Sequence, residues 1–118
     1  CCLYPGKKDL SENIRVISIM GRFLEHSRVF WFLNKNNPDV YIGSADWMRR
    51  NLDRRVEAVT PIEDVDLKKQ LEHLLDLYLN SDCGVWEMQS DGKFLNLEQD
   101  KQEICAQEEL IKLYSKRI

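Results

Sequence analysis

The sequence has few of the features that mark membrane proteins, repeat proteins and secreted leader-bearing proteins. Its longest uninterrupted apolar run, Val29–Leu33, is far shorter than the roughly 18 residues that a membrane-spanning helix needs. No signal peptide, internal repeat or low-complexity segment is visible, and there are only three prolines and five glycines. We therefore expect a globular domain without a transmembrane segment.

Metal-ligating residues are also sparse. The four cysteines, Cys1, Cys2, Cys83 and Cys105, include no CxxC pair, and no spacing of histidine and cysteine is typical of zinc. We expect no metal ligands in this chain, and reduced, buried cysteines in a cytosolic protein. Because the first residue is Cys rather than Met, we expect the chain to be part of a longer protein.

Composition and charge point to one globular domain with a local basic region. The chain has 118 residues, of which 43% are hydrophobic and 31% charged. Residues 21–55 carry seven basic and four acidic residues, whereas residues 56–118 carry seven basic and fourteen acidic residues. Six of the seven basic residues in the first of these segments are arginines. This distribution favours a focused anion site over a broad nucleic-acid surface.

The hydrophobic pattern predicts an α/β fold in which a mixed β-sheet is flanked by helices. A strand is expected from Ile14, although helical spacing also fits there. Residues 27–33 predict a buried central strand, paired as a hairpin with residues 40–46, and residues 56–62 predict a strand ended by Pro61. The intervening segment 47–55 predicts a loop or one helical turn.

The second half of the chain predicts a helix, a hairpin and a terminal helix. A leucine stripe between Leu67 and Leu79 has helical spacing, and either Asp64 or Asp66 is placed to cap its start. Asp91-Gly92 predicts the turn of a hairpin, and a last helix is expected over about residues 100–116. We thus divide the domain into a motif-bearing sheet region, residues 1–63, and residues 64–118.

Polar residues that can bind phosphate cluster between residues 21 and 55. His26 and Arg28 would share one face of a strand, and the hairpin would bring Ser44, at the end of the next strand, back beside them. An arginine-rich segment follows at once. Arginine binds phosphate oxygens through paired hydrogen bonds, and histidine near neutral pH can accept a phosphoryl group or donate a proton. We predict an anion site made by His26, Arg28, Ser44, Asn51, Arg54 and Arg55, with Arg22 as a weaker candidate.

Two families have motifs that resemble this pattern. The pair His26-x-Arg28 and Gly43-Ser44-Ala45-Asp46 resembles half of the phospholipase D signature, HxK followed by GSxN. The longer strings "LSENIRVISIMGRFLEHSRVFWF" and "VYIGSADWMRRNLDRRVEAVTPI" resemble the last catalytic domain of bacterial polyphosphate kinase, which is itself phospholipase D-like. This second resemblance covers about residues 1–63. Arginine in place of lysine, and the lack of the acid expected after it, argue against a phospholipase D hydrolase.

The resemblance to polyphosphate kinase implies reversible transfer of the terminal phosphate of ATP to polyphosphate, with magnesium bound mainly outside this chain. It implies that a histidine of the preceding domain is phosphorylated, and that His26 is the catalytic histidine across the site, with an acid or base role. It also implies a cytoplasmic or membrane-associated homo-oligomer. The isolated chain would be inactive, because the phosphorylated histidine is not in it. The alternatives are a phospholipase D-type phosphodiesterase half-site and a non-enzymatic polyanion-binding module.

Overall fold

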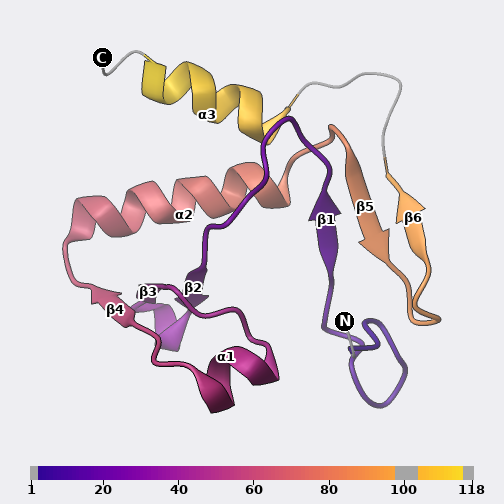
Figure 1. Ribbon diagram of the computed structural model, residues 1–118. Helices are drawn as coiled ribbons and strands as arrows, with labels where there is room; N and C mark the ends of the chain where they lie inside the picture. Colours follow the sequence, from indigo (N-terminus) through magenta and orange to yellow (C-terminus); the bar gives the residue numbers. More distant parts are fainter. Residues whose placement is uncertain (1–2, 98–103, 116–118) are drawn as a thin grey trace. The chain divides into compact units, whose positions relative to one another are not determined.

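The computed structural model describes residues 3–97 and 104–115 (Figure 1). The chain divides into two compact units, one formed by Cys1–Leu24 with Asp76–Ile118 and the other by Glu25–Leu75. Among the described residues, each unit has its own three-stranded sheet, and all strand pairs are antiparallel. The α/β class is confirmed, but the strands form two antiparallel sheets where one mixed sheet was expected.

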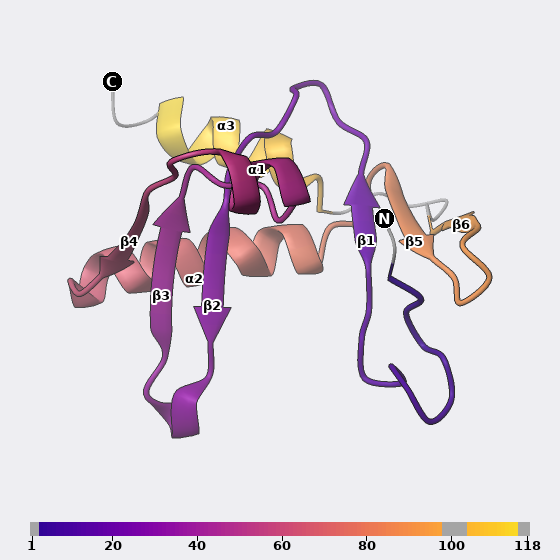
Figure 2. The ribbon, with the colours of Figure 1, turned by 60° about the horizontal axis from the view of Figure 1, so that its bottom comes forward.

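The unit Glu25–Leu75 contains a sheet in the order β2-β3-β4, with β2 at Val29–Phe32, β3 at Asp39–Gly43 and β4 at Val59–Ile62 (Figure 2). The predicted hairpin is confirmed, since β2 pairs with β3. The prediction that β2 is the buried central strand is wrong. The central strand is β3, whose Val40 is only 1% exposed, whereas Phe32 on β2 is 51% exposed.

Local sequence explains the connections within this unit. The β2–β3 turn holds a short 3-10 helix, Asn34–Asn36, whose residues all have positive φ angles, a conformation that asparagine tolerates better than most residues. Helix α1, Arg49–Arg54, occupies the segment predicted as a loop or one helical turn. Pro61 lies inside β4 instead of ending it, which the ladder tolerates because β4 is an edge strand of the described sheet.

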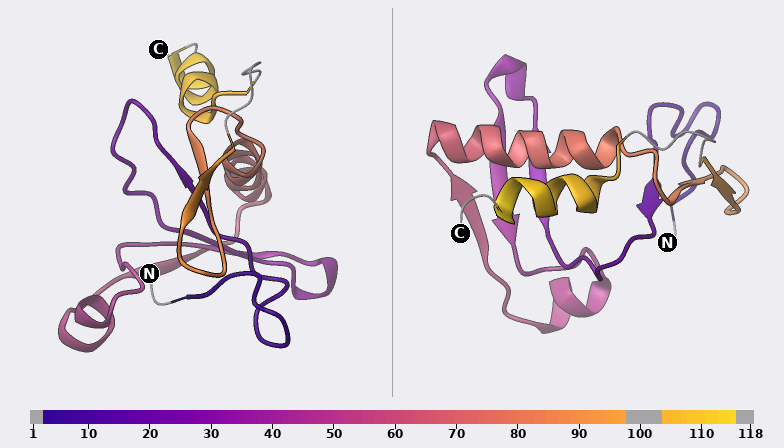
Figure 3. Two further views of the ribbon diagram at one scale, coloured as in Figure 1. Left: turned by 90° about the vertical axis from the view of Figure 1, so that its right-hand side faces the viewer. Right: turned by 90° about the horizontal axis from the view of Figure 1, so that it is seen from above.

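The other unit contains the sheet β1-β5-β6, with β1 at Ile17–Ile19, β5 at Val85–Met88 and β6 at Phe94–Asn96. The strand predicted from Ile14 is confirmed, although only its last part pairs with β5. The predicted hairpin at Asp91-Gly92 is also confirmed (Figure 3). Gly92 has a φ of 84° there, and its amide donates to the carbonyl of Gln89 at 2.9 Å.

The leucine stripe forms helix α2, Val65–Leu79, and the terminal helix α3 spans Ala106–Ser115. Asp64, not Asp66, is the cap, because its Oδ1 accepts the amides of Asp66 and Leu67, each at 2.9 Å. The ends of the predicted terminal helix lie outside the described residues. No helix in the described ranges is long and apolar enough to cross a membrane.

The cysteine prediction is wrong for one pair. Cys83 and Cys105 form a disulfide with their Cα atoms 5.0 Å apart, although we expected free thiols. The sequence could not show this pairing, because the two residues are 22 positions apart and only the tertiary fold brings them together. Cys1 and Cys2 lie outside the described residues.

Candidate functional site

The start of β2 and the end of β3 lie at one end of the sheet β2-β3-β4, beside α1 (Figure 2), and the predicted site residues Arg28 and Ser44 adjoin these strand ends in the chain. The hairpin register pairs Val29 with Ile42, and the amide of Gly43 then donates to the carbonyl of Arg28 at 3.0 Å. The start of β2 and the Gly43–Asp46 segment therefore lie side by side. This confirms the expectation that the hairpin returns the second motif to the first.

Arg28 is held in place from two directions. Its Nε and Nη2 both donate to Oδ1 of Asp46, at 2.9 and 2.7 Å, and its Nη1 donates to the carbonyl oxygen of His26. Because a guanidinium has five N–H groups, this arrangement leaves N–H groups of both Nη1 and Nη2 for a further acceptor. Arg28 is thus fixed in position by its neighbours, while donor capacity remains on its guanidinium.

The sequence led us to expect His26 and Arg28 on one face of a strand, and the structure does not show this, because neither residue lies in a strand. Both residues precede β2, which begins at Val29, so the alternation of side chains along a strand does not orient them. They are linked instead by the hydrogen bond from Arg28 to the His26 carbonyl. The imidazole of His26 is exposed to solvent and is therefore accessible to a ligand.

Ser44 and Asn51 are joined by a carboxylate that the sequence analysis missed. The Ser44 hydroxyl donates to Oε2 of Glu57 at 2.6 Å, and Nδ2 of Asn51 donates to Oε1 of the same residue at 2.9 Å. The amide of Ala58 donates to the Ser44 oxygen at 3.0 Å. Glu57 therefore connects the end of β3 with α1. The sequence signal that could have identified Glu57 is its position just before β4, a strand that pairs antiparallel with β3 and so lies opposite the Gly43–Asp46 motif.

Glu57 is kept negatively charged by its surroundings. The hydrogen bond from Ser44 lowers its pKa most, followed by that from Asn51, and the charges of Arg55 and Arg28 lower it further. A carboxylate at this point would repel an anion. Any anion bound here must then be held by the nearby arginines, or must displace Glu57 from Ser44.

Asn51 and the arginines after it differ in exposure. Asn51 is 3% exposed on the inner side of α1, and its Oδ1 has no hydrogen-bond partner among the described residues. Arg54 and Arg55 are exposed at the end of α1 and just beyond it. Arg22 belongs to the other unit, where its guanidinium lies 5.4 Å from the ring centroid of Phe23. The sheet end thus combines two exposed arginines with a buried amide.

Carboxylates at the site are already paired with protein groups, Asp46 with Arg28 and Glu57 with Ser44 and Asn51. Within the described ranges, no group of three or more His, Cys, Asp or Glu side chains could hold a metal ion. The residues at hand therefore do not fit a Mg²⁺ ion with several protein ligands.

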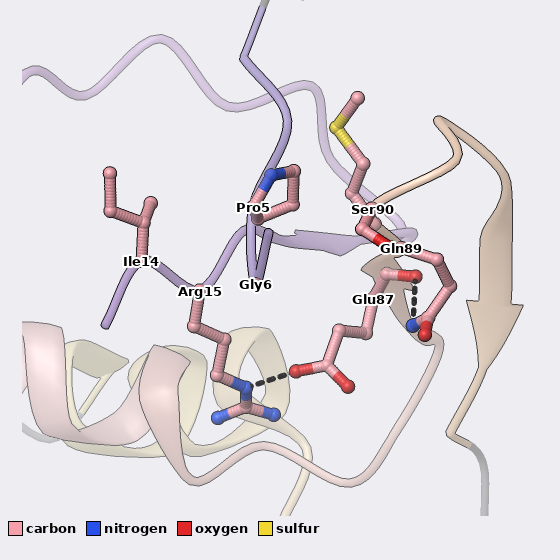
Figure 4. Close-up of a pocket in the computed structure, with 8 residues that line it drawn as sticks. Pro5, Gly6, Ile14, Arg15, Glu87, Gln89 and Ser90 are labelled. Carbon is pink, nitrogen blue, oxygen red and sulfur yellow. Dashed lines mark hydrogen bonds and ion pairs between the residues drawn. The ribbon is translucent and has the colours of Figure 1, made fainter. Parts of the chain in front are cut away.

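A hollow of about 230 Å³ lies in the other unit, between the N-terminal loop and β5 (Figure 4). Arg15 and Glu87 form an ion pair at its wall, and Nε2 of Gln89 donates to the Glu87 carbonyl at 3.2 Å. None of the predicted site residues lines it. The hollow is thus separate in sequence and composition from the arginine-bearing site.

The fold and the site define a class of protein: an α/β domain that presents a preorganised arginine, an exposed histidine and further arginines at one end of a β-sheet. The family model described as "Polyphosphate kinase C-terminal domain 2" matches residues 1–107. The chain belongs to this family.

Curated relatives and a solved structure agree with that assignment. The chain is 62% identical to the "Polyphosphate kinase" of Prochlorococcus marinus, over 100% of the chain and 17% of the relative. It is 53% identical to the "Polyphosphate kinase" of Dictyostelium discoideum, over 80% of the chain and 9% of the relative. The crystal structure of polyphosphate kinase from Porphyromonas gingivalis superposes with a TM-score of 0.90 at 31% identity, covering 99% of this chain and 18% of that one. The chain therefore spans less than a fifth of the length of these relatives.

Proposed function

We propose that this chain is the part of a polyphosphate kinase that supplies one half of the phosphate and nucleotide site. The full-length protein would transfer the terminal phosphate of ATP reversibly to inorganic polyphosphate. Family membership supports the proposed activity. The observation that supports the proposed phosphate site is the guanidinium of Arg28, which is held in place by Asp46. Phosphoryl transfer depends mainly on positioning and on neutralising charge, which such an arginine provides.

Each candidate residue has a distinct role in this proposal. His26 acts as the general acid or base, because the residue is exposed and its backbone carbonyl is hydrogen-bonded to Arg28. Arg28, Arg54 and Arg55 bind phosphate oxygens. Ser44 binds phosphate only after its hydroxyl leaves Glu57, and buried Asn51 acts through Glu57 instead of by direct contact.

The ligands and partners follow from the same assignment. ATP and ADP, inorganic polyphosphate and the remaining domains of the longer protein are the proposed partners, in a cytoplasmic homo-oligomer. Mg²⁺ would accompany the nucleotide and be bound mainly by groups outside this chain, since the carboxylates at the site are paired with protein groups. No step assigned to this chain passes through the metal.

Replacement of His26 tests the proposal. In the full-length protein, His26→Ala should lower kcat for ATP-dependent polyphosphate synthesis by about 10²–10⁴-fold, the usual contribution of a general acid or base. His73→Ala is the matched control, because His73 is exposed on α2 and should be dispensable. An unchanged kcat in His26→Ala would remove His26 from the mechanism, and tight polyphosphate binding without turnover would favour a binding module.

A further inference from the structure

The disulfide lies between two contacts that hold the chain segment after β1, Met20–Phe23. On one side, the amide of Met20 donates to the carbonyl of Gly84 at 2.8 Å, and Gly84 directly follows Cys83. Gly84 has a φ of 62°, and a Cβ there would overlap the Met20 carbonyl oxygen. Only glycine fits this close approach of two backbones.

Gln107 holds the same segment from the other side, two residues after Cys105. Its Oε1 accepts the amide of Phe23 at 2.9 Å, and its Nε2 donates to the Phe23 carbonyl at 2.9 Å. A Cβ at Gly21 would overlap the Gln107 amide group, so the two also pack tightly. Gln107 is 8% exposed, which keeps water from competing with these hydrogen bonds. In Figure 1 the loop after β1 passes the start of α3.

Hydrogen bonds also join the two cysteine-bearing segments. The amide of Asp82 donates to the Ile104 carbonyl at 2.9 Å, and the Ile104 amide donates to Oδ1 of Asp82 at 2.9 Å. The Ser81 hydroxyl lies 3.2 Å from the Ile104 carbonyl and 3.4 Å from the Ala106 amide. The covalent link at Cys83–Cys105 therefore ties the Gly84 contact to the Gln107 contact.

We propose that Cys83 and Cys105 form a thiol–disulfide exchange site, and that its redox state sets how firmly Met20–Phe23 is held. Disulfides of proteins in reducing compartments are usually transient or redox-sensing, and both cysteines here are half-buried instead of sealed in a core. The held segment leads along the chain to His26, three residues after Phe23. The inference goes beyond the proposed phosphotransfer; it rests on the cytoplasmic location given under the proposed function, but not on the phosphotransfer activity.

The exchange balances with a dithiol as reductant. One thiolate of the dithiol attacks a sulfur of the disulfide, and the other protein sulfur leaves as a thiolate that takes up a proton. The second thiol of the reagent then displaces the first protein sulfur. Two electrons and two protons pass to Cys83 and Cys105, and the reagent becomes a cyclic disulfide.

Alkylation and hydrogen exchange on the full-length protein test this inference without any activity assay. Purified without reductant, the protein should yield a linked Cys83–Cys105 peptide. Dithiothreitol without denaturant should make both cysteines alkylatable, and oxidised glutathione should restore the link. Reduction should also speed hydrogen exchange at the amides of Met20 and Phe23 by about tenfold or more. Two free thiols in the unreduced protein, or a link that dithiothreitol cannot break, would overturn the proposal.

Two controls separate the disulfide from general loosening of the fold. The amide of Gly43 donates a hydrogen bond to the Arg28 carbonyl within the unit Glu25–Leu75. It should exchange at the same rate with and without dithiothreitol. The double variant Cys83→Ser, Cys105→Ser should exchange at Met20 and Phe23 like the reduced protein and ignore the reagent. A response of this variant to dithiothreitol, or equal exchange in reduced and oxidised wild type, would refute the link between redox state and the held segment.

Discussion

At the scale of single residues, Arg28 is fixed by hydrogen bonds to Asp46 and to the His26 carbonyl, and in the proposed site it is held ready for a phosphate. A lysine at this position has one nitrogen and cannot contact Asp46 twice while also reaching the His26 carbonyl. We expect Arg28→Lys to lower kcat/KM of the full-length enzyme by about tenfold or more, because charge remains but paired donors are lost. Steady-state kinetics with ATP and polyphosphate would measure this effect.

The matched control for that variant is Arg49→Lys. Arg49 also pairs with a carboxylate, Asp53, but its side chain is 94% exposed on α1. Such surface pairs contribute little, so kcat/KM should stay near the wild-type value. Equal losses in both variants would show that Arg28 acts through general electrostatics and not through its fixed geometry.

Glu57 should make the α1 end of the site sensitive to acid. Its pKa is lowered in the folded chain, so the stability it contributes is present above its unfolded pKa and is lost as pH falls through the lower folded pKa. Protonation of the Glu57 carboxylate would weaken the hydrogen bonds that it accepts from Ser44 and Asn51. In an NMR titration, the side-chain amide signal of Asn51 should shift with a midpoint below the ordinary glutamate range.

The variant Glu57→Gln tests the assignment of that titration. Glutamine has no charge to lose, so the acid shift of the Asn51 amide signal should disappear. A shift that persists unchanged in Glu57→Gln would mean that another carboxylate controls Asn51.

Sequence reasoning named candidate residues that the fold brings near one another, and it missed Glu57, which connects Ser44 with Asn51. His26, Arg28 and Ser44 stand in motifs of recognisable spacing. Glu57 belongs to no motif, and its role depends on β3–β4 register, which pairs Gly43 with Val59. The near-complete burial of Asn51 depends on how α1 packs, which residue spacing alone does not determine.

At the level of elements, the sequence predicted helix α2 but left its N-terminal cap open between two residues. Both Asp64 and Asp66 could have capped it, and the structure selects Asp64. We expect Asp64→Ala to lower the free energy of opening the first helical turn by about 1 kcal/mol, because two amides lose their acceptor. Hydrogen exchange at the amides of Asp66 and Leu67 would measure the change.

Asp66→Ala is the control for that cap. The side chain of Asp66 forms an exposed ion pair with Lys69 at 3.7 Å, so its loss should cost a few tenths of a kcal/mol. A larger loss at Asp66 than at Asp64 would contradict the assignment of the cap.

The helix and the hairpin were predicted from local sequence periodicity and turn residues. The order of the strands within a sheet could not be predicted from composition. The stripe Leu67–Leu79 and the Asp91-Gly92 turn are local signals, and both are confirmed. The aromatic run of β2 suggested a central strand, but aromatic side chains can also shield an edge. Phe30 stacks on Trp47, a loop residue, with ring centroids 5.4 Å apart, so part of its packing comes from outside the sheet.

At the scale of the whole molecule, the chain divides into two units, and the candidate site residues around His26 and the disulfide belong to different units. One unit, Glu25–Leu75, holds His26 and the residues around Glu57, and the other joins the two ends of the chain. No local pattern predicts this division, because it depends on residues 1–24 joining residues 76–118. The disulfide Cys83–Cys105 lies within the second of these units.

The proposed half-site makes a prediction about the chain on its own. The 118-residue chain spans 17% of its Prochlorococcus relative, and the resemblance places the phosphorylated histidine in a domain outside it. The chain alone should therefore form no polyphosphate from ATP, while the full-length protein should. Transfer of label from γ-labelled ATP into acid-insoluble polyphosphate would measure both. A chain whose helical circular dichroism shows it to be folded and which still makes polyphosphate would contradict the half-site, because it would contain every group that the transfer needs.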